Sequence, residues 1–310
     1  RMHQMKYAII GAGGTGGCLG FFLQKAGKDV TLIARGKHLE AIRKNGLTIQ
    51  KLWDESRETL PVKACTAEEY KEIPDVILVC IKGYSMDETV PTIKKIAGKE
   101  TVVIPILNIY GTGGRLQKKL PELTVTDGCI YVSANILEPG VILQHGKILR
   151  VVFGARKPEE ETEKMREVAK DMVTDDLEVI LSENIRRDAM VKFSYVSPIG
   201  TAGLYCNAVA ADFQREGEQR EMFKALIREI VALSHAMEIE FAEDLVERNL
   251  KILAALSPEA TTSMQRDVME EKCSEMDGLV YEVVRMGEEY KVDMPQYKKA
   301  AARFREQGIL

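Results

Sequence analysis

The segment from Lys6 to Ile42 restricts the possible folds most, because it has the order strand, glycine turn, helix, strand. Its turn, GAGGTG, follows the apolar run Tyr7–Ile10 and matches the pattern GxGxxG. The first glycine of this pattern permits a tight turn, the second lets a pyrophosphate approach the backbone, and the third lets the helix pack closely. The alternative is a turn that serves packing alone. Because of its context we expect the turn to bind a dinucleotide, through Gly11, Ala12, Gly13, Gly14, Thr15 and Gly16.

The end of the second predicted strand distinguishes between cofactors. A protein that binds NAD often places Asp or Glu there, to accept a hydrogen bond from the ribose 2′-hydroxyl group. This chain has Arg35 and Lys37 instead, and Asp29 stands too early for that role. A guanidinium group pairs well with a 2′-phosphate, so Arg35, with Lys37 as a second candidate, predicts NADP(H). Alternatively, Lys37 and His38 form only a solvated helix start, and we favour this for His38.

The first half of the chain alternates apolar runs with helical patterns, which is typical of a doubly wound parallel sheet. The predicted strands are 7–10, 30–33, 76–81 and 101–107, and the predicted helices are 16–26, 37–45, 85–97 and 113–119. Beyond residue 125 we expect a strand meander over 129–137, 141–144 and 148–153, a helix from Pro158 to Met172 and a strand over 177–181. This predicts an α/β Rossmann-type domain over residues 1–183.

The second half of the chain has no confident strand pattern. Helical periodicity covers 223–236, 242–256 and 276–290, so we expect an all-α domain over residues 184–310. No flexible linker separates the two domains. The apolar faces of these helices could support a homodimer, or they could be buried within one chain.

Composition excludes several classes of function. A net charge of -4 argues against a broad nucleic-acid-binding surface. No apolar run reaches the roughly 18 residues that cross a bilayer, and no cleavable signal is visible. The six cysteines are scattered without a CxxC pair, which favours a reduced, cytoplasmic protein without a structural metal.

The first half of the chain contains the motifs LIARGKHLEAIRKNGLTI, VILVCIK ending at Lys82, PILNIYG containing Asn108, EPGVILQHG and VFG. The second half contains Lys192 and the stretch TSMQRD…SEMDG. These motifs resemble those of the ketopantoate reductase (2-dehydropantoate 2-reductase) family. The matches run in order along nearly the whole chain and are closer in its first half.

The resemblance implies that a Rossmann-type domain binds NADPH and that a helical domain closes over a 2-oxo acid. It assigns proton donation to Lys192, the grip on the substrate's hydroxyl group to Glu275 and the grip on its carboxylate to Ser263. Asn108 falls where the family has an asparagine near the nicotinamide and the substrate, and Lys82 ends the preceding strand.

Each of these roles has a chemical reason and a simpler rival. An ammonium group stabilises charge on a ketone oxygen and can deliver a proton, but Lys192 alone could be a surface lysine with a buried stem. Glu275 stands among charged residues, as on a solvated helix face. Ser263 lies about 120° out of phase with it on one straight helix, so the chain must bend if both reach one ligand. Otherwise Thr262 or Ser263 is only a cap.

The chain departs from the family pattern next to Lys192. The family has asparagines four and eight residues after the lysine, where this chain has Val196 and Gly200. Ser194, Ser197 and Thr201 stand nearby and could substitute, although Pro198 perturbs a helix there. The departures bear on the substrate more than on the cofactor, because a pocket discriminates through the polar groups that it pairs.

The sequence thus predicts an NADPH-dependent reductase of ketopantoate, which acts in pantothenate and coenzyme A biosynthesis. One alternative is a related NADP-dependent reductase of another 2-oxo acid. A second is a non-catalytic NADP-binding sensor, which would fit the missing asparagines.

Overall fold

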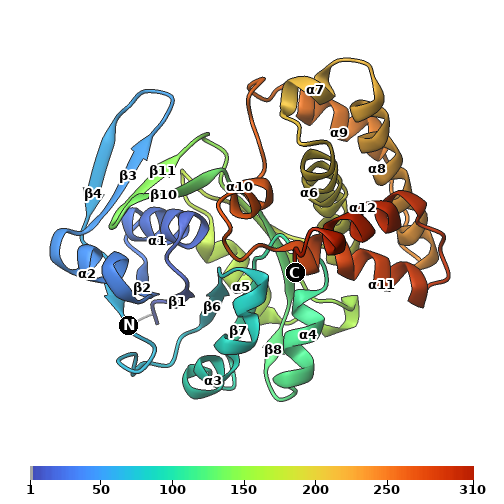
Figure 1. The fold of residues 1–310 in the computed structure, drawn as a ribbon. Coiled ribbons are helices and arrows are strands. Elements are labelled where there is room, and N and C mark those ends of the chain that lie inside the picture. The colour runs from blue at the N-terminus through green and yellow to red at the C-terminus, as the bar shows by residue number, and fades with distance from the viewer. Residues whose placement is uncertain (1–2) are drawn as a thin grey trace. The chain divides into compact units, whose positions relative to one another are not determined.

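A computed structural model describes residues 3–310 of the chain (Figure 1). The chain divides into two compact units. The first consists of the residues up to Leu107 and of Gly111–Ile185. The second consists of Asn108–Tyr110 and Arg186–Leu310. The short loop Asn108–Tyr110 therefore belongs to the second unit, although its neighbours in sequence belong to the first.

The centre of the first unit is a six-stranded parallel sheet in the order β5-β2-β1-β6-β7-β8. Its strands are β1 (Lys6–Ile10), β2 (Asp29–Ile33), β5 (Lys63–Cys65), β6 (Val76–Val79), β7 (Val102–Pro105) and β8 (Thr124–Val125). The sequence shows β6 and β7 as continuous apolar runs because every residue in them is buried. The strand order reverses direction between β1 and β6, which is where ligands bind in such sheets.

The helices of this sheet are α1 (Gly14–Lys25), α2 (Gly36–Asn45), α3 (Met86–Ile96) and α4 (Thr112–Lys119), with the short 3-10 turn η1 (Gly83–Ser85). In Figure 1 the blue helix α1 lies beside β10 (Ala134–Glu138) and β11 (Val141–Gln144). The close approach of α1 to β10 requires a glycine at position 14, because a Cβ on Gly14 would lie 2.3 Å from the Ala134 carbonyl oxygen.

The predicted three-stranded meander is wrong. Its segments belong to two further sheets, one in the order β10-β11-β3-β4 and one in the order β13-β12-β9. The additional strands are β3 (Leu47–Lys51), β4 (Arg57–Leu60), β9 (Asp127–Tyr131), β12 (Arg150–Gly154) and β13 (Glu178–Leu181). Sequence periodicity missed β3, β4, β5 and β8. The strand β4 has mostly polar side chains and no buried residue, and β5 and β8 are only three and two residues long.

The helix predicted from Pro158 begins later. Pro158–Glu160 forms a separate 3-10 turn, η2, and the helix α5 runs over Glu163–Met172. Thr162 caps α5 by accepting a hydrogen bond from the Met165 N–H, 3.2 Å away. The start of the helix is therefore set by this threonine cap and not by the proline.

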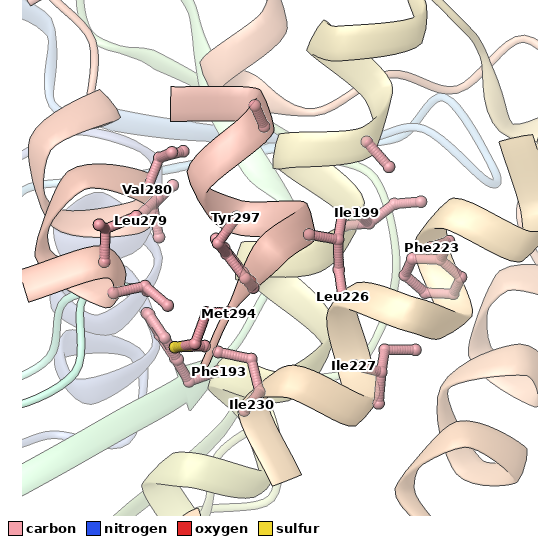
Figure 2. Close-up of a cluster of buried hydrophobic side chains, with 14 of the residues drawn as sticks. Phe193, Ile199, Phe223, Leu226, Ile227, Ile230, Leu279, Val280, Met294 and Tyr297 are labelled. Atoms are coloured by element: carbon pink, nitrogen blue, oxygen red, sulfur yellow. The ribbon is translucent and has the colours of Figure 1, made fainter. Parts of the chain in front are cut away.

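The second unit is helical, and none of its residues lies in a strand, as predicted. Its helices are α6 (Ile185–Cys206), α7 (Ala210–Gln214), α8 (Glu218–Ala236), α9 (Leu245–Ala254), α10 (Ser263–Met269), α11 (Glu282–Glu289) and α12 (Pro295–Glu306). A π-helical turn, η3 (Asp277–Tyr281), precedes α11. Figure 2 shows part of the apolar core that these elements share, with Phe193 of α6, Phe223 of α8 and Tyr297 of α12.

Pro198 does not interrupt α6, which continues through it to Cys206. A proline has no N–H, so the Ser194 carbonyl group four residues earlier lacks its helical partner. The buried Asn249 of α9 supplies the missing donor, with Nδ2 3.0 Å from that carbonyl oxygen. The expected perturbation is thus absorbed by a side chain from a neighbouring helix.

Candidate active site

The glycine turn has the geometry that its sequence predicts. Gly11 adopts a φ of 99°, which favours glycine, and a Cβ on Gly16 would lie 1.8 Å from the Gly11 carbonyl oxygen. Gly13, in contrast, has no atom within 4 Å of the place of its Cβ. The turn therefore packs tightly on its protein side and is open beside Gly13, where a pyrophosphate would approach. These features fit a dinucleotide.

Arg35 follows β2 at the same edge of the sheet, directly before α2. Its side chain is exposed, as is that of Lys37, and none of the ion pairs described in residues 3–310 involves either one. Asp29 lies at the opposite end of β2 and pairs with Lys63. An adenosine ribose would lie beside the end of β2. The protein offers a cation there and no carboxylate of β2, and this fits a 2′-phosphate.

His38 is not a solvated residue, and our expectation for it is wrong. Its Nε2 lies 2.6 Å from the Ala12 carbonyl oxygen, and its Nδ1 accepts a hydrogen bond of 2.9 Å from the Gly140 N–H. The i, i+4 spacing with the buried Ile42 was the signal that could have placed His38 on the inner face of α2.

Lys82 follows β6 at the same edge, and is half-buried at the start of η1. The strand ends at Val79, two residues earlier than predicted. Gly11, Arg35 and Lys82 thus come after the carboxyl ends of three adjacent strands, which is the ligand-binding edge of a doubly wound sheet.

In the second unit, Lys192 and Asn108 are in direct contact although 84 residues separate them. The half-buried Lys192 on α6 donates a hydrogen bond from Nζ to Asn108 Oδ1, at 3.0 Å. An ammonium group has three N–H donors, and this bond uses one of them. The amide oxygen orients the lysine without removing its proton.

Each residue of the loop Asn108–Tyr110 contacts residues of the helical unit. Ile109 is 6% exposed and belongs to the helical core, where Gly278 packs on it. A Cβ on Gly278 would lie 2.4 Å from the Ile109 side chain. The Tyr110 ring lies 6.1 Å from the Phe193 ring, centre to centre. These contacts, together with that of Lys192, fix the position of Asn108.

Glu275 and Ser263 lie on different elements, as the required bend implies. Ser263 is the first residue of α10, which ends at Met269, whereas Glu275 precedes η3. Glu275 is only 7% exposed, so it is not part of a solvated helix face. Thr262 is the N-cap of α10 and forms a capping box with Gln265. Thr262 therefore has the capping role that was the alternative prediction for this pair. Ser263 is half-buried beside it.

Ser194, Ser197 and Thr201 do not replace the missing asparagines, because all three are buried and bonded elsewhere. The Ser194 and Thr201 hydroxyl groups donate to carbonyl groups of α6 itself, and Ser197 Oγ donates to the Leu279 carbonyl group at 2.6 Å. Along the face of α6 beyond Lys192, Val196 packs on the core and Gly200 lies against Met264. Neither Val196 nor Gly200 offers a hydrogen-bonding side chain here, although Thr262 Oγ1 would lie 3.9 Å from a Cβ on Gly200.

Comparison with protein-family models decides the family. The model described as ketopantoate reductase PanE/ApbA matches residues 7–158, and the model of the C-terminal part of the same family matches residues 184–306. The chain belongs to the ketopantoate reductase family. The predicted family and the predicted fold class, a Rossmann-type domain followed by a helical domain, are therefore confirmed.

Individual relatives agree with this membership. A 2-dehydropantoate 2-reductase from Mesorhizobium japonicum is 29% identical over 303 residues and covers 91% of each chain. The crystal structure of a 2-dehydropantoate 2-reductase from Porphyromonas gingivalis is 27% identical, with a TM-score of 0.81 and coverage of 97% and 99%. D-mandelate dehydrogenase, solved with NADH and anilino(oxo)acetate, shares the fold at 20% identity, a TM-score of 0.84 and 96% coverage of both chains.

The family membership makes the chain an oxidoreductase and agrees with NADP(H) as its cofactor. Within residues 3–310, no cluster of three or more His, Cys, Asp or Glu side chains could hold a metal ion. In the same residues, no helix has the length and apolar character to cross a membrane.

Proposed function

We propose that this protein reduces the C2 ketone of 2-dehydropantoate (ketopantoate) to the alcohol of pantoate, with NADPH as the reductant, in pantothenate and coenzyme A biosynthesis. The observation that carries the proposal is the hydrogen bond between Lys192 and Asn108, in a chain of this family. It holds an ammonium group on the first helix of the helical unit, where the family has its proton donor.

NADPH would supply the hydride that the C2 carbon accepts. As the carbonyl bond becomes a single bond, negative charge develops on its oxygen, and Lys192 Nζ stabilises this charge and transfers a proton to it. The resulting neutral amine regains a proton from solvent. Asn108 keeps Nζ in place, since its Oδ1 accepts from an N–H that is not transferred.

We assign the two ends of the substrate to Glu275 and Ser263. The Glu275 carboxylate would accept a hydrogen bond from the hydroxyl group of ketopantoate, which suits a buried acceptor. The Ser263 hydroxyl group would donate to the substrate carboxylate. Both residues are on segments that pack against α6 or the Asn108 loop, through Met264 and Gly278 respectively.

The cofactor would be held by the glycine turn Gly11–Gly16, with Arg35 on the 2′-phosphate. Lys37 and Lys82 are further cations for the phosphates and the nicotinamide ribose, and Asn108 is assigned to the nicotinamide as well. The open space beside Gly13 and the exposed cation at Arg35 support this assignment.

A second candidate function is reduction of a different 2-oxo acid. The apolar face formed by Val196, Gly200 and Met264 favours it, because unpaired polar groups of a substrate are costly against such a surface. A substrate panel distinguishes the two candidates. We expect ketopantoate to have the highest kcat/KM with NADPH, and NADH to be far weaker.

The Glu275→Gln variant sharpens this test. It should lower kcat/KM for ketopantoate but not for 3,3-dimethyl-2-oxobutanoate, which lacks the hydroxyl group. Equal losses on both acids would contradict the role of Glu275, and a preferred substrate other than ketopantoate would support the second candidate. Binding of NADPH without turnover of any acid would instead indicate a sensor.

We further propose the domain division 1–183 and 184–310, a cytoplasmic location and a homodimer. A solved ketopantoate reductase from Staphylococcus aureus, 19% identical, is described as dimeric. Light scattering of the purified protein would measure the number of chains in the assembly.

A further inference from the structure

His38 joins three segments of the first unit that are distant in sequence. It lies near the start of α2, bonds to the glycine turn at Ala12 and bonds to the turn between β10 and β11 at Gly140. A backbone N–H can only donate, so the Gly140 bond shows that Nδ1 carries no proton. Nε2 therefore carries the proton and donates to the Ala12 carbonyl oxygen, and the ring is neutral.

The bond to Ala12 determines the direction of one N–H group of the glycine turn. The peptide between Ala12 and Gly13 is trans, so its carbonyl and N–H groups point in opposite directions. Because His38 holds the carbonyl oxygen, the Gly13 N–H points away from the ring. Gly13 is also the residue beside which the turn is open.

We propose that His38 is a positioning residue of the cofactor site, whose neutral ring holds the Ala12–Gly13 peptide so that the Gly13 N–H faces the pyrophosphate of NADPH. This inference rests on the proposed function. Through Gly140, the same ring fixes the β10–β11 turn against the glycine turn.

The surroundings of the ring favour its neutral form. Its half-buried position lowers the pKa of His38 from the usual value, and the bond to Ala12 only partly opposes this effect. The charged residues nearest in sequence to these bonds lie on two segments. Arg35, Lys37 and Glu40 lie at the start of α2. Glu138 precedes the β10–β11 turn and pairs with Arg57. The glycine turn has no charged residue.

Three variants separate the two bonds. His38→Gln can keep the donor to Ala12, because Gln Nε2 reaches about as far as the ring Nε2. His38→Asn can keep only the acceptor for Gly140, and His38→Leu keeps neither. Glu40→Gln, an exposed change on the same helix, is the matched control.

The experiment measures the Kd of NADPH and of adenosine 2′-phosphate for each variant by titration calorimetry. Adenosine 2′-phosphate has the phosphate that Arg35 would bind but no pyrophosphate. We expect His38→Leu and His38→Asn to weaken NADPH about tenfold, the equivalent of roughly one hydrogen bond, with adenosine 2′-phosphate unchanged. His38→Gln should lie closer to the wild type, and Glu40→Gln should equal it.

Two results would overturn the inference. The first is equal weakening of both ligands, since it would mean a general disturbance of α2. The second is unchanged NADPH binding in His38→Leu. In the wild type, the ratio of the two Kd values should be constant from about pH 8 to 7, because a pKa below the usual value leaves His38 mostly neutral there. A change in this ratio within that range, absent from His38→Leu, would contradict a neutral ring. A wild type that does not bind NADPH would overturn the proposed function together with this inference.

Discussion

In the proposed cofactor site, Arg35 is the residue that would determine the choice between NADPH and NADH. It is exposed at the end of β2, where an NAD-binding protein would have a carboxylate. A guanidinium group can form two charge-assisted hydrogen bonds with a 2′-phosphate and has no equivalent interaction with a 2′-hydroxyl group.

Replacing Arg35 with Glu should reverse this preference. We expect the Kd of NADPH to rise about 100-fold, or ~2.7 kcal/mol, from lost bonds and added repulsion. The Kd of NADH should stay constant or fall, because glutamate can accept from the ribose 2′-hydroxyl group. Fluorescence titration measures both, with Lys44→Glu on the exposed side of α2 as the charge-matched control. Parallel losses for the two cofactors would contradict the role of Arg35.

At the scale of the element, α6 depends on a side chain from α9. Asn249 is fully buried and donates to the Ser194 carbonyl group that Pro198 leaves without a helical donor. It also lies 3.1 Å from Ser194 Oγ. Because Lys192 is on the same helix, this contact also bears on the site.

Asn249→Ala should lower the free energy of unfolding by about 1–3 kcal/mol, since it leaves a buried carbonyl group unpaired. In a Pro198→Ala background the loss should be smaller, because the substituted alanine has a backbone N–H that can bond to the Ser194 carbonyl group. Urea denaturation of the four proteins gives this double-mutant cycle. An identical loss in both backgrounds would show that the two residues are not coupled.

Sequence patterns predicted those helices, strands and turns whose own residues determine their structure. The buried strands β6 and β7 are apolar throughout. The spacing of the glycines in the turn reflects the close approach of Gly16 to the Gly11 carbonyl oxygen. The edge strand β4, with the sequence RETL, has no such pattern and is defined by its partner β3. The role of Asn249 depends on a contact across 55 residues, which no local pattern reports.

At the scale of the whole molecule, the candidate site could be predicted only in part. The residue types at Lys192, Glu275 and Asn108 were visible in the sequence. That Asn108–Tyr110 packs with the helical unit was not visible, because it follows from the tertiary contacts of Ile109 and Tyr110. The two hydrogen bonds of His38 are tertiary contacts as well, and its i, i+4 spacing with Ile42 predicts only the face of α2 on which it lies.

NADPH should stabilise the whole molecule by binding only the folded chain. At a free concentration of about 100 times its Kd, we expect the free energy of unfolding to rise by about 2.7 kcal/mol. Gly13→Ala should lose most of this effect while its own melting temperature stays near that of the wild type, because its Cβ meets no protein atom. Gly16→Ala should melt much earlier even without NADPH, because its Cβ would overlap the Gly11 carbonyl oxygen. Differential scanning fluorimetry compares the three proteins, and a full NADPH shift in Gly13→Ala would contradict the assigned approach of the pyrophosphate.

The turnover of the Lys192→Ala variant with ketopantoate and NADPH tests the central claim most directly. Loss of a general acid should lower kcat by about 10²–10⁴-fold, while the Kd of NADPH stays that of the wild type. Lys298→Ala, an exposed change on α12 of the same unit, should leave kcat unchanged. A Lys192→Ala enzyme with kcat within a few-fold of the wild type would show that another group delivers the proton.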